Sequence, residues 1–221
     1  MSLSQFRLFQ LEFGALLTYT PRPSSPQTLR SKDAMYLLKK DGFMGNPPVL
    51  MSESIAKKIQ EKMMELPFAS FFGADAILVP APTNSLMQRD TLWVPKRIAD
   101  ALVGRGIGKT VSPCLVRATA LRKSAFCEPQ GRPTAAEHYA SICVQGKLAE
   151  PNEILLIDDI ITRGATLMGA ANRLADAFPN AHIRAFAAMR TISNAYEFKD
   201  LYDPCKGTID LVDTGESFRT P

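Results

Sequence analysis

The strongest constraint on the fold is an apolar run that ends in two adjacent acids and a glycine-containing turn, at residues 154–166. Four consecutive aliphatic residues precede Asp158 and Asp159, and two more separate the acids from the turn at 162–166. Beyond the turn, apolar side chains recur at helical spacing until Pro179. The pattern predicts a strand, a turn and a helix, which together are half of a βαβ unit.

The predicted geometry makes this turn a candidate site for a sugar phosphate. A continuously apolar strand is typical of a parallel sheet covered by helices on both faces, and ligands bind at the carboxyl ends of such strands. Asp158 and Asp159 are acceptors suited to a vicinal diol or, indirectly, to a magnesium ion. The turn at 162–166 offers backbone N–H groups, two hydroxyls and a glycine, and the following helix directs its positive end at the same place.

This order of residues resembles the phosphoribosyl pyrophosphate (PRPP) signature of the type I phosphoribosyltransferases: aliphatic residues, two acids, two aliphatic residues and a turn rich in threonine and glycine. The resemblance implies that Asp158 and Asp159 bind the 2′- and 3′-hydroxyls of the ribose. It also implies a cradle for the 5′-phosphate, formed by Thr162, Arg163, Gly164, Ala165 and Thr166. The alternative is an ordinary strand, turn and helix, in which the acid pair needs another charge partner.

A second apolar run, at residues 76–80, predicts another buried strand. In the family, the loop after the first core strand binds pyrophosphate through backbone N–H groups. Pro80 and Pro82 lack that donor. The resemblance therefore assigns the pyrophosphate contacts to Ala81, Thr83, Asn84, Ser85 and Arg89. A solvated loop charge is the alternative for Arg89.

The segment at residues 118–134 contains basic residues among small ones and follows a short predicted strand at 114–117. Type I enzymes place a mobile loop between the second and third core strands, and this loop closes over PRPP with basic side chains. Such a lid excludes water while positive charge meets the departing pyrophosphate. By this resemblance Lys123 and Arg132 are the predicted catalytic residues, and solvated loop charges are the alternative.

The elements in order predict a strand, a helix, a strand, the lid, a strand, a helix and a strand. Right-handed crossovers give the predicted fold, which is an α/β open parallel sheet of four to five strands flanked by helices, as in the type I phosphoribosyltransferases. We predict a single domain over 1–221, with its core at 74–190 and a C-terminal tail at 191–221. The hydrophobic content of 46% suits one such domain.

Residues 1–70 are the predicted N-terminal extension. Residues 6–19 have an apolar period of two, which predicts a β-ribbon or hairpin with Gly14 as a bend or bulge. Helices are predicted at 28–40 and from Ser52 onward. In the type I family, a segment outside the core sheet forms a hood that contacts the acceptor. The N-terminal extension resembles this hood in its position in the chain. An extension that only packs or dimerises is the alternative.

Composition excludes several classes of protein. The four cysteines are scattered without a Cys-x-x-Cys pair, which predicts reduced thiols, and two histidines cannot build a histidine-rich metal site. The chain shows no secretory signal and no apolar run near the ~18 residues of a membrane span. We therefore predict a cytoplasmic protein with no membrane partner. The net charge of +4 suits the binding of small polyanions and does not by itself support nucleic-acid binding. Nucleic-acid binding and a homodimer both stay open.

The predicted activity is Mg²⁺-dependent transfer of ribose 5-phosphate from PRPP to a nitrogen nucleophile, with release of pyrophosphate. The acceptor, a nucleobase or an amine, stays open. Thr162 disfavours 6-oxopurine salvage, because an aspartate acts on the purine N7 at that position in those enzymes. Arg163 and the residues after it resemble the glutamine amidophosphoribosyltransferases, and residues 79–82 resemble the competence-type (ComF-like) homologues. Both groups carry an N-terminal domain with cysteines, and we do not expect such a domain in this chain. The alternative is a non-catalytic PRPP or nucleotide sensor, or a competence or DNA-handling protein that keeps the fold.

Overall fold

The computed structural model describes residues 5–88, 90–122, 131–146 and 150–221. Among these residues a seven-stranded sheet has the order β11-β10-β1-β9-β8-β4-β5. Its strands β1, β9, β8, β4 and β5 run parallel, and β10 and β11 are antiparallel to their neighbours. The bounds are β1 (Gln10–Tyr19), β4 (Ile77–Pro80), β5 (Thr110–Val111), β8 (Glu153–Ile161), β9 (His182–Thr191), β10 (Tyr202–Leu211) and β11 (Ser217–Thr220).

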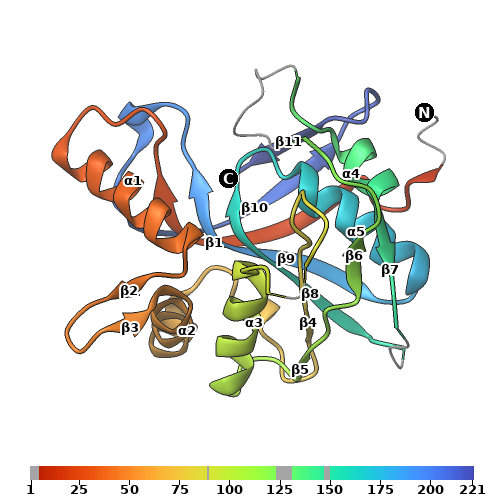
Figure 1. The fold of residues 1–221 in the computed structure, drawn as a ribbon, viewed down its shortest axis with the longest axis horizontal. Helices are drawn as coiled ribbons and strands as arrows, with labels where there is room; N and C mark the ends of the chain where they lie inside the picture. The colour runs from red at the N-terminus through yellow and green to blue at the C-terminus, as the bar shows by residue number, and fades with distance from the viewer. Residues whose placement is uncertain (1–4, 89, 123–130, 147–149) are drawn as a thin grey trace.

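Helices and short hairpins complete the fold (Figure 1). The helices are α1 (Pro26–Lys39), α2 (Met51–Lys62), α3 (Val94–Gly104), α4 (Ala135–Ser141) and α5 (Ala165–Ala177), with 3₁₀ helices at Met63–Glu65, Ala69–Phe71 and Ala195–Glu197. The hairpins pair β2 (Phe43–Met44) with β3 (Val49–Leu50), and β6 (Leu115–Arg117) with β7 (Ile142–Val144). No helix in the described part of the chain is both long enough and apolar enough to cross a membrane.

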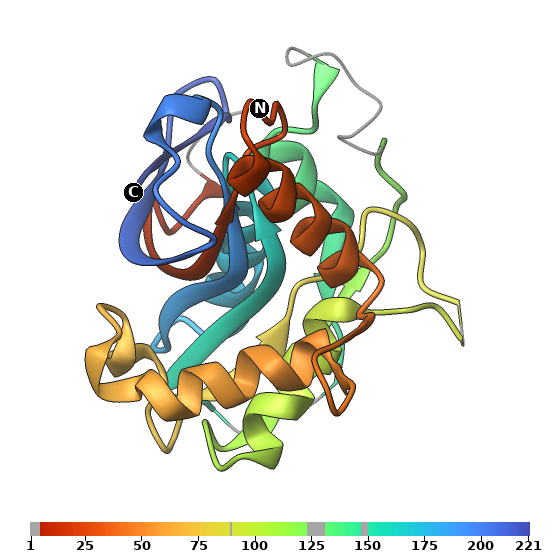
Figure 2. The same cartoon turned by 90° about the vertical axis from the view of Figure 1, so that its left-hand side faces the viewer.

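The interior strand β8, between β9 and β4, contributes alternate side chains to two separate hydrophobic cores. Ile154 and Leu156 pack into the core that contains α4 and α5, whereas Leu155 and Ile157 pack into the core that contains α2 and α3. Figure 2 shows the helices on both sides of the sheet. This arrangement explains why the run has no polar residue, since a strand covered on both faces has no solvent-facing side.

The sheet is larger than the predicted four to five parallel strands, and its extra strands come from both ends of the chain. The predicted β structure within residues 6–19 is confirmed by β1, but the predicted ribbon or hairpin is wrong, because β1 is one continuous strand between β9 and β10. A Cβ added at Gly14 would lie 2.4 Å from the Phe68 ring, so this glycine permits close packing and is not a bend. The period-two reading failed because residues 13–18 are buried on both faces.

The prediction that the strand at 114–117 belongs to the core sheet is also wrong. Residues 115–117 form β6, which pairs antiparallel with β7 in a separate two-stranded sheet, and the parallel neighbour of β4 is β5. A run of three strand residues does not indicate which sheet it joins. The predicted helices near 28–40, from Ser52 and after the 162–166 turn are confirmed as α1, α2 and α5.

The strand order reverses between β4 and β8, and this position sets where a ligand can bind. From β4 the chain returns through α3 to β5 on one side, while from β8 it returns through α5 to β9 on the other side. Because α3 and α5 cover opposite faces of the sheet, the segments that leave the carboxyl ends of β4 and β8 diverge. Open α/β sheets bind ligands in the crevice at such a point.

Candidate functional site

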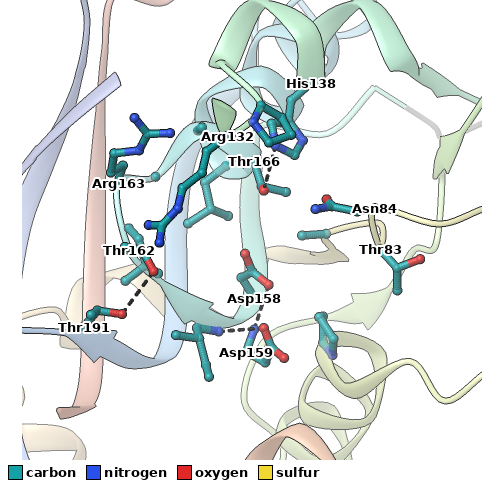
Figure 3. A pocket seen from close by; sticks show the side chains of 18 of the residues that line it. Thr83, Asn84, Arg132, His138, Asp158, Asp159, Thr162, Arg163, Thr166 and Thr191 are labelled. Carbon is teal, nitrogen blue, oxygen red and sulfur yellow. Dashed lines mark hydrogen bonds between the residues drawn. The ribbon is translucent and has the colours of Figure 1, made fainter. Parts of the chain in front are cut away.

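A cavity of about 890 Å³ lies at the carboxyl ends of β4 and β8 (Figure 3). It brings together three groups of residues that are distant in the sequence, which are the acid pair of β8, the turn at 162–166 and the loop at 81–85. Every residue of the predicted ribose site and of the predicted 5′-phosphate cradle lines this cavity. Among the described residues predicted to bind pyrophosphate, the lining includes Ala81, Thr83, Asn84 and Ser85.

The N-terminus of α5 opens into the cavity without a capping side chain. The first four N–H groups of a helix have no partner within the helix, so those of Ala165 and Thr166 can donate to a ligand. The N-cap residue Gly164 has a φ of 84°, and a Cβ added to it would lie 2.7 Å from the side chain of Ile209. The turn therefore requires glycine at this position on both grounds.

The two acids of β8 point toward different neighbours. Asp159 forms an ion pair with Lys39 at the end of α1, with 2.9 Å between Lys39 Nζ and Asp159 Oδ2, and its side chain is 13% exposed. Burial raises the pKa of Asp158 well above its usual range, and the charge of Asp159 raises it further, while Lys39 acts in the opposite direction. If the segment is only an ordinary strand, turn and helix, the acid pair needs a charge partner. Lys39 is such a partner for Asp159.

Hydrogen bonds from other segments fix the position of the loop at 81–85. The Trp93 indole N–H donates to the Ala81 carbonyl at 2.7 Å, and the Leu121 N–H donates to the Asn84 carbonyl at 2.9 Å. The Ala81 N–H is not free for pyrophosphate, because it donates to the Ile157 carbonyl at 2.8 Å and extends the pairing of β4 with β8. Within the residues that the structure describes, the N–H groups of Thr83, Asn84 and Ser85 have no hydrogen-bond acceptor.

Arg132 is the one predicted catalytic residue that falls among the described residues, and it lines the cavity. Figure 3 shows its side chain on the side of the 162–166 turn, away from Thr83 and Asn84. Its Nε is buried and has no hydrogen-bond partner within the described chain. Lys123 and Arg89 lie outside the described residues.

Sequence reasoning missed several cavity residues that come from other parts of the chain. They include Tyr19, Arg22 and Lys39 from the N-terminal segment, Thr191 from β9 and His138 from α4. The Thr191 hydroxyl lies 3.0 Å from that of Thr162. No local pattern marks Lys39, since it ends an otherwise ordinary helix 120 residues from its partner. His138 was visible only as one of two histidines.

Carboxylates line the site, and its described residues form no preformed metal centre. Across the described ranges, no group of three or more His, Cys, Asp or Glu side chains is placed to hold a metal ion. Magnesium prefers near-octahedral oxygen ligands and commonly reaches proteins through phosphates and one or two carboxylates. The cavity therefore fits a magnesium ion that is carried by a phosphorylated ligand, near the acid pair.

A comparison of the sequence with protein-family models found no match, and a comparison with curated proteins found none either.

Proposed function

We propose that the protein is a magnesium-dependent phosphoribosyltransferase, which transfers ribose 5-phosphate from PRPP to a nitrogen nucleophile. One observation carries the proposal. The acid pair of β8, the uncapped N-terminus of α5 and the loop after β4 open into the same cavity at the point where the strand order reverses. These groups suit a diol, a phosphate monoester and a diphosphate, and PRPP contains all three.

Each part of the cavity has a distinct role in the proposed reaction. Asp158 and Asp159 accept hydrogen bonds from the ribose hydroxyls, and Lys39 moves from Asp159 as the ribose binds. The N–H groups of Ala165 and Thr166 bind the 5′-phosphate. The N–H groups at Thr83 to Ser85 bind the pyrophosphate, and Arg132 adds positive charge from the side of the 162–166 turn (Figure 3).

In the chemical step, the bond between C1 of the ribose and the pyrophosphate oxygen breaks. A bond from the acceptor nitrogen to C1 forms on the opposite face, and the proton of that nitrogen is released. The transition state resembles an oxocarbenium ion, so catalysis consists of holding the ribose and stabilising the departing pyrophosphate. Magnesium, when bound with PRPP, neutralises part of the phosphate charge.

The direct test measures PRPP binding and then pyrophosphate release. We expect calorimetry with Mg²⁺ to detect PRPP binding, and we expect PRPP at 100 times its Kd to stabilise the fold by about 2.7 kcal/mol. Pyrophosphate release is then measured with a panel of nucleobases and amines. The control is the Asp158→Asn, Asp159→Asn double variant, which we expect to fold and to lose ribose binding.

The possible outcomes separate the proposal from its alternative. PRPP binding together with pyrophosphate release for at least one acceptor supports the transferase. PRPP binding without release for any acceptor favours a non-catalytic PRPP sensor, which needs the phosphate cradle but no charge that closes on pyrophosphate. If millimolar PRPP with Mg²⁺ produces neither heat nor thermal stabilisation, both functions are wrong.

A further inference from the structure

Arg117 of β6 is a buried arginine that contacts both sides of the cavity without lining it. Its side chain is only 2% exposed. The Nε donates to the carbonyl of Thr83, in the loop at 81–85, at 2.8 Å. An Nη2 atom lies 3.3 Å from Nδ1 of His138, and Nη1 donates to the hydroxyl of Ser141.

His138 continues this chain of contacts to the 5′-phosphate side. It is 1% exposed, and its Nε2 lies 3.4 Å from the hydroxyl of Thr166, in the first turn of α5. Arginine can only donate, so Nδ1 of His138 is the acceptor and the ring proton is on Nε2. The ring nitrogen therefore donates toward Thr166, and the Thr166 hydroxyl keeps its own proton to donate to a ligand.

The protonation of His138 agrees with this arrangement. Burial and, as a smaller cause, the positive charge of Arg117 together lower the pKa of His138 to about 3. Among the described residues, Arg117 of β6 is the charged group that acts on the ring, and the other ring contact, the Thr166 hydroxyl of α5, is neutral. The histidine is thus neutral at physiological pH and acts as a fixed donor.

Among the described residues, the hydrogen-bond partners of the Arg117 guanidinium are neutral groups. Within the described chain no carboxylate lies within 4.0 Å of its guanidinium, and burial lowers its pKa to about 10. An unpaired buried charge is unfavourable unless hydrogen bonds and a counter-charge compensate for it. The hydrogen bonds are present, and an anion in the adjacent cavity would supply the counter-charge.

We propose that Arg117 and His138 are positioning residues that join the two anion-binding segments of the cavity. Arg117 orients the loop at 81–85 through the Thr83 carbonyl and, through His138, orients the Thr166 hydroxyl at the start of α5. A phosphate monoester and a pyrophosphate then bind against one shared buried positive charge. This inference rests on the proposed function, because it assigns those two anions to those two segments.

The test compares two probes, ribose 5-phosphate and inorganic pyrophosphate with Mg²⁺, by calorimetry on the full chain. We expect Arg117→Gln to weaken both probes by about tenfold or more, since it acts on both segments. We expect His138→Phe to weaken ribose 5-phosphate by about tenfold and pyrophosphate by less than about twofold. A merely structural role would lower both affinities together for both variants.

Two further variants serve as controls. His138→Gln keeps an amide N–H near the position of Nε2 and should recover most of the affinity that His138→Phe loses. Arg173→Gln removes an arginine that also contacts α4, donating to the Tyr139 carbonyl at 2.6 Å, but does not line the cavity. We expect wild-type affinities for Arg173→Gln. In Arg117→Gln, NMR titration of His138 should show a higher pKa than in the wild type.

The outcomes distinguish this inference from the proposed function. If the wild type binds neither probe, both are wrong. If the wild type binds both probes and Arg117→Gln binds them equally well, only the positioning role is wrong. If Arg117→Gln does not fold, the comparison of His138→Phe with His138→Gln decides, and equal ribose 5-phosphate affinity in these two variants contradicts the inference.

Discussion

At the scale of single residues, the adjacent acids of β8 lie in different electrostatic environments. Asp159 has Lys39 as a partner, whereas burial and the charge of Asp159 raise the pKa of Asp158. The folded protein therefore binds the Asp158 proton more tightly than the unfolded chain does. Stability from this residue falls as the pH rises from the ordinary carboxyl pKa to the raised one, and the loss is complete above it.

Asp158→Asn should therefore stabilise the free protein at about pH 8, and the gain should disappear near pH 4, where the wild-type carboxyl holds its proton. The Asp159 N–H, which donates to Asp158 Oδ1 at 2.8 Å, keeps an acceptor in the amide. Each 1 kcal/mol gained should raise the Tm by about 2–4 °C in a chain of this size. Thermal unfolding across this pH range checks the prediction.

The matched variant is Asp159→Asn, which loses the ion pair with Lys39 and should show no such gain at high pH. Equal melting temperatures for Asp158→Asn and the wild type at about pH 8 would contradict the assigned environment of Asp158.

At the scale of one element, the N-terminus of α5 combines a left-handed glycine with uncapped N–H groups. Gly164 sits against Ile209 of β10, so the start of the helix approaches the sheet closely. The Ser217 hydroxyl, from β11, donates to the Arg163 carbonyl at 3.1 Å and holds the other side of the turn. The position of the cradle thus depends on strands from the C-terminal part of the chain.

We predict that Gly164→Ala weakens ribose 5-phosphate binding by about tenfold or more, because the new Cβ displaces N–H groups from a charged acceptor. The backbone strain should also lower stability by about 1 kcal/mol or more. Gly106→Ala is the control. Gly106 has a φ of 74° with nothing within 4 Å of an added Cβ, and it does not line the cavity.

Calorimetry and thermal unfolding of both variants separate strain from binding. Gly106→Ala should lose stability without losing affinity. Wild-type affinity for ribose 5-phosphate in Gly164→Ala would mean that the turn is only a connection between β8 and α5.

At the scale of the whole molecule, the N-terminal segment is part of the central sheet. β1 pairs with β9 on one side and with β10 on the other, and its residues Phe13, Ala15 and Leu16 are buried. The same segment leads into α1, which carries Lys39 to the cavity. The N-terminal part therefore contributes both to the core and to the site.

Removal of residues 1–20 should abolish cooperative unfolding, because it removes the strand that joins β9 to β10 in the sheet. Removal of residues 215–221 takes away β11, an edge strand that pairs only with β10 in the described sheet, and should leave a cooperative transition at a lower temperature. Circular dichroism with heating measures both. A stable, cooperatively unfolding protein that lacks residues 1–20 would show that β1 is dispensable.

The sequence by itself determined the unit that organises the site. The apolar run of β8, the acid pair, the glycine turn and α5 lie within 25 consecutive residues, from 153 to 177, and the sequence patterns that predict them are local. Their order also implied a ligand site at the carboxyl end of a buried parallel strand. The loop at 81–85 was predicted for the same reason, since it follows a second such strand.

Tertiary structure alone decided the size of the sheet, the place of β1 and the far wall of the cavity. Lys39 and Asp159 are 120 residues apart, and Arg117 meets Thr83 and His138 across 34 and 21 residues. Such contacts depend on which strand lies beside which, and alternating apolar residues do not encode the neighbour. Buried charges such as Arg117 look like solvated loop charges in a sequence, because burial is a property of packing.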